Sequence, residues 1–375
     1  MRVLLVTWTD QLLQKLQTLN PKLEYCAIVV DEVEPAKKIL ERVGLTKDLL
    51  YPLYDLKECV RDLHYDYVLC VENGWGRDFP KVLTDYGVPK DKIVSLNFLD
   101  NGNFFVERVL RYFKEHAAEF DMFATGISYT EVGLDITRFK KKLFNFARSS
   151  QDLYYNFQVA KHAVLWGGGH SRLKYALIGL SPYSFHYDLS RSSNLSFLML
   201  HYLIAFEDVH NFHMPADKYK TLLRKEYFSM RMPLEPFDLN NPFYAKTPLK
   251  FMTPEKRLKA RADVDGWQKR CFPETCAENV KILDEYLTLC EENHIRPIMF
   301  LPPLSEGYMK HFSRQKLDEF YYLVKQACRK HSAAIFIDGW KLQGITDADF
   351  YDVGHMNIQG AAKFSTFLNS VIESL

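Results

Sequence analysis

Short apolar runs alternate with amphipathic stretches along the first hundred residues. The runs are rich in β-branched residues, and the stretches between them repeat apolar residues at helical spacing. This alternation predicts a parallel sheet covered by helices on both faces. The predicted strands are residues 3–6, 25–30, 67–71 and 92–96, and the predicted helices are 10–19, 35–43, 56–63 and 79–86.

The same alternation continues beyond residue 100 and returns after residue 270. Asn101, Gly102 and Asn103 interrupt it, so we place a domain boundary near residue 100. The pattern predicts an α/β protein of two three-layer α/β/α units, residues 1–100 and 101–375. The predicted strands of the second unit include residues 120–124, 174–179, 297–301 and 334–337, and its helices include 104–120, 129–134, 153–165, 277–294, 316–331 and 359–372.

The pattern changes between about residues 194 and 270. Helical stretches at 195–206 and 217–228 alternate with segments rich in proline, asparagine and aromatic residues, such as 232–248. We interpret this region as an insertion in the second domain that covers its site. The aromatic residues are compatible with a sugar-stacking surface and with a small satellite core.

Composition narrows the class of protein. The 375 residues are 25% charged with a formal net charge of +1, which gives no electrostatic reason to expect nucleic acid or an acidic membrane as partner. No apolar run reaches the ~20 residues that span a bilayer. The seven cysteines are scattered and odd in number, which favours buried free thiols in a reducing compartment and no metal site. We therefore expect a soluble, cytoplasmic protein.

The turn after the first predicted strand, residues 7–10, contains no glycine. A dinucleotide site needs glycines there so that the backbone can approach the pyrophosphate, so no nucleotide cofactor is expected. Gly74 and Gly76 form a second glycine-containing loop, which fits either a ligand contact or a plain turn. The arrangement resembles the small Rossmann-like domains attached to enzymes of surface-carbohydrate biosynthesis, in which the first loop is usually rich in glycine.

Ser128 lies where the predicted strand 120–124 turns into a helix. At the carboxyl edge of a sheet, such a serine projects its hydroxyl into the crevice, as a nucleophile would. Serine is also a favoured N-cap, and Glu131 three residues later would complete a capping box. The residues alone favour the cap, with the nucleophile as the alternative interpretation.

Asp352 and His355 stand three residues apart on a turn ahead of the last predicted helix. An aspartate so placed can face Nδ1 of the imidazole and leave Nε2 free to act as a general base. The alternative is that both residues make only local turn and cap bonds before that helix.

Four sequence blocks follow one another along the second domain: FATGISYTEVGLD around Ser128, NFARSSQD at 145–152, LIGLSPYS at 177–184, and DVGH at 352–355. In this order the chain from about residue 120 to its end resembles the SGNH/GDSL hydrolase superfamily. It is most similar to the branch with the D-alanyl-transfer proteins of teichoic acid systems and the alginate-type O-acetyltransferases, in which a strand exit like Leu301-Pro302-Pro303 also occurs. The resemblance implies an SGNH-hydrolase-like, flavodoxin-like second domain.

The resemblance also implies roles for individual residues. Ser128 matches the nucleophile, His355 the base and Asp352 the acid that orients it, while the N–H groups of Ser128 and Ser150 match oxyanion donors. Ser150 stands where the second block normally has glycine. Ser181 stands where the third block normally has an asparagine donor; Ser181, Tyr183 or Ser150 could replace that donor, and Asn145 and Gln151 are further candidates for substrate contacts.

The resemblance implies a serine-dependent esterase or O-acyltransferase of bacterial type that acts on an acylated carbohydrate, in surface-polysaccharide metabolism. The expected partner is a small-molecule or glycan ester. Since the third-block asparagine is absent, the alternative is a catalytically inactive binding or scaffold protein of a glycan-assembly pathway.

Overall fold

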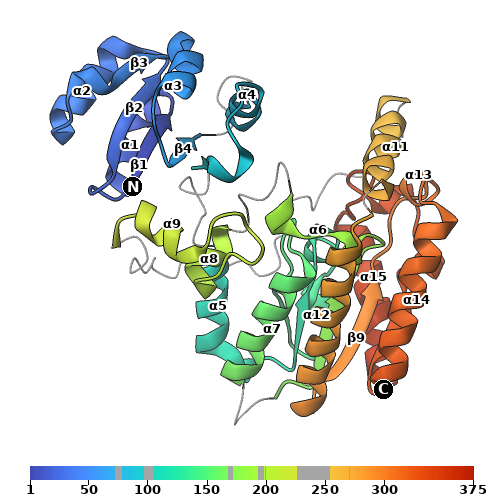
Figure 1. Ribbon diagram of the computed structural model, residues 1–375. Helices are drawn as coiled ribbons and strands as arrows, with labels where there is room; N and C mark the ends of the chain where they lie inside the picture. Colours follow the sequence, from blue (N-terminus) through green and yellow to red (C-terminus); the bar gives the residue numbers. More distant parts are fainter. Residues whose placement is uncertain are drawn as a thin grey trace. The chain divides into compact units, whose positions relative to one another are not determined.

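The computed structural model describes residues 1–71, 78–96, 105–167, 172–192, 198, 200–225, 254–269 and 271–375. The chain forms two α/β units (Figure 1). One unit comprises Met1–Glu107 and Ser190–Pro233, and the other comprises Arg108–Leu189 and Leu234–Leu375. Each is built on a five-stranded parallel sheet, which confirms the predicted α/β class.

The sheet of the first unit has the strand order β3-β2-β1-β4-β5. Its central strand is wholly enclosed, with Val3, Leu4, Leu5 and Val6 at 0% exposure, as expected for a parallel strand covered on both faces. The strands are β1 (Arg2–Val6), β2 (Glu24–Val30), β3 (Leu50–Pro52), β4 (Tyr67–Cys70) and β5 (Ile93–Ser95), and the helices between them are α1 (Thr9–Thr18), α2 (Val33–Val43), α3 (Leu56–Asp62) and α4 (Phe79–Asp85).

Bulky side chains fill the space beyond β1. Trp8 is buried against the ring of Phe79, with centroids 5.1 Å apart. The N–H and hydroxyl of Thr9 donate to Asp31 Oδ1 at 2.9 and 2.8 Å. The turn after β1 therefore packs against protein at the point where a dinucleotide-binding sheet presents bare backbone. The loop at 74–76 lies outside the described residues.

A distant segment completes the first unit. Helices α8 (Leu200–Phe206) and α9 (Ala216–Leu222) belong to it, and the chain after α9 forms an antiparallel bridge between Leu223 and Leu19. The N–H of Asn20 donates to Leu222 O at 2.7 Å, next to this bridge. The region at 194–270, predicted as an insertion of the second domain, is thus divided. Its described residues up to 225 group with the first unit, and only α11 (Pro254–Gln268) groups with the second.

The second unit has the strand order β10-β9-β8-β6-β7, so the order reverses between β6 and β8. Its strands are β6 (Met122–Thr125), β7 (Leu143–Asn145), β8 (Tyr175–Gly179), β9 (Arg296–Leu301) and β10 (Ile335–Asp338). Its helices, besides α11, are α5 (Phe105–His116), which begins at the junction of the units, α6 (Ser128–Glu131), α7 (Leu153–Gly167), α12 (Pro273–Glu292), α13 (Glu306–Met309), α14 (Arg314–Lys330) and α15 (Ile358–Glu373).

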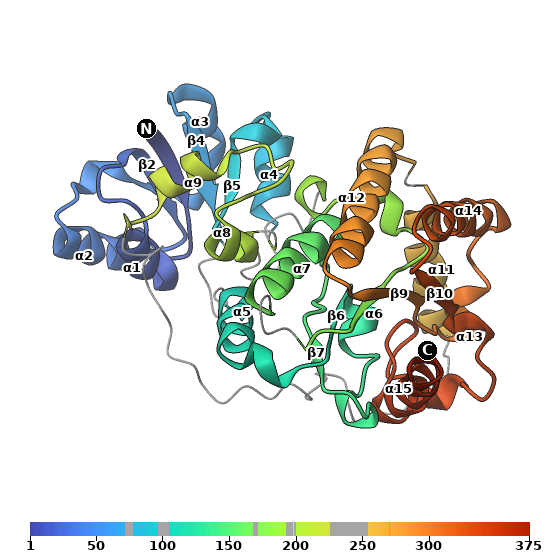
Figure 2. The same ribbon diagram turned by 90° about the horizontal axis from the view of Figure 1, so that it is seen from below.

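Helices cover both faces of this second sheet. Helices α7 and α12 lie side by side in both views, and Tyr286 of α12 hydrogen-bonds to Thr125 Oγ1 of β6 at 3.0 Å (Figures 1 and 2). Because side chains alternate along a strand, Met122 and Ala124 of β6 face the other way. There they join a core cluster with Phe364 and other residues of α15. Within the described part of the chain, no helix is long and apolar enough to cross a membrane.

Two glycines allow α6 to approach the ends of β6 and β8. A Cβ atom at Gly179 would lie 1.8 Å from Thr130 Oγ1, and one at Gly126 would lie 2.4 Å from the same atom. Gly126 also has a φ of +154°, which L side chains rarely adopt. The turn that carries Ser128 therefore packs directly on the sheet edge, which fixes its position.

Gly179→Ala is expected to lower the free energy of unfolding by about 2–3 kcal/mol, because Thr130 must shift within a close-packed core. In a Thr130→Ala background the same substitution should cost less, since two of the three clashing atoms are gone. Urea denaturation measures both values. Gly266→Ala is the control, because a Cβ there meets nothing within 4 Å. Equal effects of Gly179→Ala in the two backgrounds would contradict the proposed clash.

Candidate active site

Three chain segments leave the second sheet where its strand order reverses. Ser128 follows β6, Ser150 follows β7 and Ser181 follows β8. In open α/β sheets, ligands bind at the carboxyl ends of the strands at such a switch point. The topology therefore brings all three predicted serines to the edge of the sheet where a site is expected.

Ser128 is the first residue of the one-turn helix α6, and its side chain makes no capping bond. The N-cap position belongs to Ile127 instead. The hydroxyl of Ser128 lies 2.9 Å from Nε2 of His355, and the side chain of Glu131 accepts from the Ser149 hydroxyl at 2.8 Å. The interpretation of Ser128 and Glu131 as a capping box is thus wrong, and the helix predicted at 129–134 is shorter.

Asp352 contacts both the ring and the backbone of His355. Each of its carboxylate oxygens lies 2.9 Å from Nδ1 of the imidazole. Oδ1 also accepts the N–H groups of Gly354 and His355, at 2.9 and 2.8 Å. The local turn bonds are therefore present together with the orienting contact. The last helix is capped by Asn357, so neither Asp352 nor His355 is needed for that purpose.

The loop that carries this pair is anchored to the exit of β9. The N–H and hydroxyl of Ser305 both donate to the carbonyl of Val353, at 3.3 and 2.6 Å. The N–H of Tyr351 donates to His355 O at 2.8 Å, and the ring of Tyr129 lies 5.3 Å from the imidazole. Since Ser305 is fully buried, the position of His355 is set by the core.

The contacts of Asp352 keep its carboxyl group ionised. Burial alone would raise its pKa, but the hydrogen bonds from His355 and Gly354 and the charge of His355 together hold the pKa below its usual value. An ionised Asp352 accepts from the Nδ1–H of His355. Nε2 is then left as the acceptor that faces the Ser128 hydroxyl.

This lowered pKa predicts a specific acid sensitivity. A depressed folded-state pKa contributes stability above the unfolded-state value of about 3.9, and this contribution is lost as the pH falls through the folded-state pKa. The free energy of unfolding of the wild type should therefore fall more steeply below about pH 4 than that of Asp352→Asn. Urea denaturation between about pH 5 and pH 2.5 measures the two slopes. Parallel slopes would mean that Asp352 does not contribute.

Ser150 adopts the conformation that normally calls for glycine. Its φ is +63°, in a tight turn closed by the Gln151 N–H donating to Arg148 O at 3.0 Å. The hydroxyl of Tyr187 donates to Ser150 O at 3.0 Å and holds this peptide. Among the described residues, no acceptor is bound to the N–H of Ser128 or of Ser150. Both N–H groups are thus available for an oxyanion.

Ser181 is engaged within its own loop. Its N–H donates to Ser184 Oγ at 2.9 Å, and the two hydroxyl oxygens lie 3.1 Å apart. Tyr183 donates its hydroxyl to Tyr129 at 3.2 Å and stacks on Trp267 with ring centroids 3.8 Å apart. Both residues thus bond to other protein groups at this edge of the sheet.

The other two predicted substrate contacts also bond to protein. Asn145 donates to Glu131 O at 3.2 Å and accepts the Ala147 N–H at 3.0 Å. Gln151 donates to Phe146 O at 3.4 Å and to Asn156 Oδ1 at 2.7 Å. The side chains of Asn145 and Gln151 thus support the turns around Ser128 and Ser150.

Sequence reasoning did not single out Tyr187, Ser305, Trp267 or Asn156. Each reaches the site through tertiary packing, and none belongs to a motif whose spacing places it there. Tyr187 lies three residues beyond the block that ends at Ser184, and Asn156 lies four residues beyond the block that ends at Asp152, but spacing alone gives neither residue a chemical role.

Among the described residues of this unit, one group of possible metal ligands lies apart from Ser128, Asp352 and His355. Atoms of His186, Cys276 and Glu319 lie within 4.8 Å of one another. Glu319 Oε2, however, lies 3.2 Å from His186 Nε2 and 3.1 Å from the ammonium of Lys316. A cation would have to displace Lys316, so these residues form an ion-paired cluster that suits packing better than metal binding.

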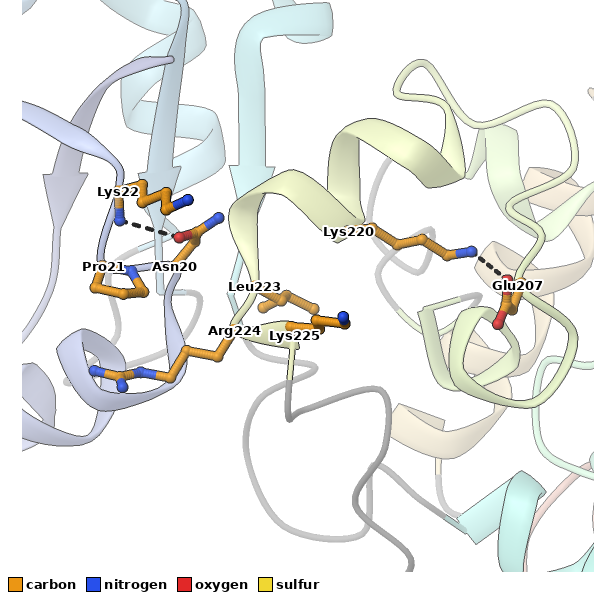
Figure 3. Close-up of a pocket in the computed structure, with 8 residues that line it drawn as sticks. All are labelled: Asn20, Pro21, Lys22, Glu207, Lys220, Leu223, Arg224 and Lys225. Atoms are coloured by element: carbon orange, nitrogen blue, oxygen red, sulfur yellow. Dashed lines mark hydrogen bonds and ion pairs between the residues drawn. The ribbon is translucent and has the colours of Figure 1, made fainter.

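The first unit has a cavity in which half of the lining residues are basic (Figure 3). Lys220 pairs with Glu207, while Arg224 and Lys225 point in opposite directions (Figure 3). The cavity adjoins Lys22, just ahead of β2, and so lies at the amino edge of the sheet. Open α/β sheets bind ligands at the other edge, so this cavity does not support nucleotide binding by the first unit.

Comparison of the chain with protein-family models and with curated proteins finds no match.

Proposed function

We propose that this protein is a serine-dependent esterase or O-acyltransferase whose catalytic residues are Ser128, His355 and Asp352. The observation that carries the proposal is the 2.9 Å distance between Ser128 Oγ and His355 Nε2. This is the hydrogen-bond reach that a nucleophile and its base require. It joins residues 227 positions apart in the sequence, which no local turn or cap explains.

The chemistry follows from the donors and acceptors at these atoms. His355 Nε2 takes the proton of Ser128 as Oγ attacks the ester carbonyl carbon, and Asp352 stabilises the imidazolium. The N–H groups of Ser128 and Ser150 donate to the oxyanion. The leaving alcohol then takes the proton from His355, and an acyl group remains on Ser128. Water or a second hydroxyl releases this acyl group by the same steps in reverse.

Two features support an SGNH-hydrolase-like class for the second unit. Counted along the chain, the second sheet has the order 2-1-3-4-5, which is that of flavodoxin-like sheets. The left-handed Ser150 occupies the position at which the SGNH/GDSL hydrolase superfamily has glycine. We therefore propose an SGNH-hydrolase-like domain, and we propose an acylated carbohydrate as the substrate because of the resemblance to the O-acyl-transfer branch.

The proposal is tested with a fluorophosphonate probe and an ester panel. The probe should attach to Ser128, as shown by mass spectrometry of the labelled peptide. The panel should contain short p-nitrophenyl esters and acetylated sugars, with and without a sugar acceptor. Acyl transfer to the acceptor identifies a transferase, and hydrolysis alone identifies an esterase. A protein that neither reacts with the probe nor turns over any ester would contradict the proposal.

The second candidate is an inactive binding or scaffold protein of a glycan-assembly pathway. The observation that favours it is the local engagement of Ser181 at the position of the missing asparagine donor. Losing one such donor typically slows catalysis by about 100- to 1,000-fold. Glycan binding that persists in Ser128→Ala, together with no turnover by the wild type, would support this alternative.

A further inference from the structure

The side chain of Asn156 is placed to supply the oxyanion donor that position 181 lacks. Asn156 lies in the first turn of α7 and is 3% exposed. It lines a small cavity together with Gly179 and Ser181 of the third block. Ile127 and Gln151 line the same cavity, and they are the immediate neighbours of Ser128 and Ser150. The cavity therefore borders the two turns that carry these serines.

The orientation of the Asn156 amide is fixed by Gln151. Gln151 Nε2 donates to Phe146 O at 3.4 Å, so this end of its amide must be the NH₂ group. The same Nε2 lies 2.7 Å from Asn156, which must therefore present its oxygen there. The nitrogen of the same amide, Asn156 Nδ2, has no hydrogen-bond acceptor among the described residues. The amide nitrogen of a residue that is only 3% exposed normally donates to an acceptor.

The carboxylate that lines this cavity is held by other donors. Asp152 also lines the cavity, and its two carboxylate oxygens accept the N–H groups of Tyr155 and Leu189 at 2.9 and 2.8 Å. These bonds hold the carboxylate in place and supply it with donors. The amide nitrogen of Asn156 therefore keeps unused donor capacity in the cavity wall.

We propose that Asn156 Nδ2 is the third donor of the oxyanion hole, in place of an asparagine at position 181. This assignment rests on the proposed acyl-transfer function. The donor reaches the hole from α7, one element earlier in the chain than the third block. Gln151 is then a positioning residue, because it orients the amide of Asn156 without contacting the substrate.

The test compares Asn156→Ala with Asn156→Leu. Leucine restores the lost volume but cannot donate, so a packing defect is relieved by leucine whereas a missing donor is not. We expect both variants to lose about 100- to 1,000-fold in kcat for a p-nitrophenyl ester, with KM changed by less than about threefold. Inhibition by a trifluoromethyl ketone, which forms an oxyanion on Ser128, should weaken by a similar factor. Asn369→Ala on α15, where the side chain accepts only the Lys140 N–H, is the matched control.

The possible outcomes separate this assignment from the function on which it rests. A folded Asn156→Leu protein with kcat within about fivefold of the wild type would refute the donor role while leaving the triad intact. A loss confined to KM would also refute it. A wild type that turns over no ester and does not react with a fluorophosphonate would instead refute the proposed function.

Discussion

Ser128→Ala is expected to reduce kcat/KM for a short p-nitrophenyl ester by about 10⁴-fold or more, because the attacking oxygen is removed and water must replace it. The remaining activity would come from substrate binding and the oxyanion donors alone. The thermal midpoint should change little, since the Ser128 side chain is only partly buried and caps no helix. Initial-rate kinetics and a thermal melt on the same preparation measure both effects.

A second serine variant shows whether the loss is specific. Ser370→Ala on α15 removes a hydroxyl that bonds only to the carbonyl three residues earlier, so it should retain the activity of the wild type. Covalent labelling by a fluorophosphonate should disappear in Ser128→Ala and persist in Ser370→Ala. A Ser128→Ala protein with activity within about tenfold of the wild type would remove Ser128 as the nucleophile.

The framework of both sheets could be predicted because buried parallel strands carry a strong local signal. β1, β2 and β9 consist almost entirely of buried apolar residues, and helical spacing marks the stretches around them. β3 was not predicted, because it has three residues and ends at Pro52 on the edge of the sheet. An edge position tolerates proline, and a segment so short shows no periodicity.

The division of the chain into units could be predicted less accurately than the strands of the two sheets. The segment at 200–225 groups with the first sheet through the bridge between Leu19 and Leu223, about two hundred residues apart. Hydrophobic periodicity reports which face of an element is buried, but it does not report which partner buries it. We therefore assigned the whole of 194–270 to the second domain by its position along the chain.

The environment of Ser128 is a second case in which a local sequence pattern does not identify the tertiary partner. Ser128 and Glu131 satisfy the spacing of a capping box, yet the helix starts with Ser128 and Ile127 takes the N-cap position. The decisive contact comes from His355, more than two hundred residues later. Local pattern therefore favoured the wrong interpretation of Ser128, and only the order of the four blocks along the chain suggested the contact with His355.

The structure also explains how Ser150 can stand where glycine is usual. A left-handed serine costs on the order of 1 kcal/mol, and the surrounding structure must compensate for this cost. Here the Tyr187 hydroxyl binds the carbonyl of Ser150, and Asn279 of α12 donates to the carbonyl of Tyr187 at 3.0 Å. The left-handed turn that glycine allows is thus formed here with serine, which the residue type alone does not reveal.

Asp352→Asn is expected to lower kcat by about 10²- to 10⁴-fold at neutral pH, although it alters a single atom. The oxygen of the new amide can still accept the N–H groups of Gly354 and His355, so the turn should be preserved. Its NH₂ group would then face Nδ1 and force that nitrogen to be the acceptor. The proton would move to Nε2, which could no longer accept the Ser128 proton, and the imidazolium would lose its counter-charge.

The tautomer of His355 can be observed directly, which separates this mechanism from a loss of fold. ¹⁵N-labelled imidazole signals should show Nδ1–H in the wild type and Nε2–H in Asp352→Asn. Asp338→Asn is the control, because that carboxylate also accepts a backbone N–H, from Trp340, but serves the exit of β10. If Asp352→Asn stayed within about threefold of the wild type, the turn bonds of Asp352 would be its whole role. The base would then have to be oriented by the core behind it, through Ser305 and Tyr129.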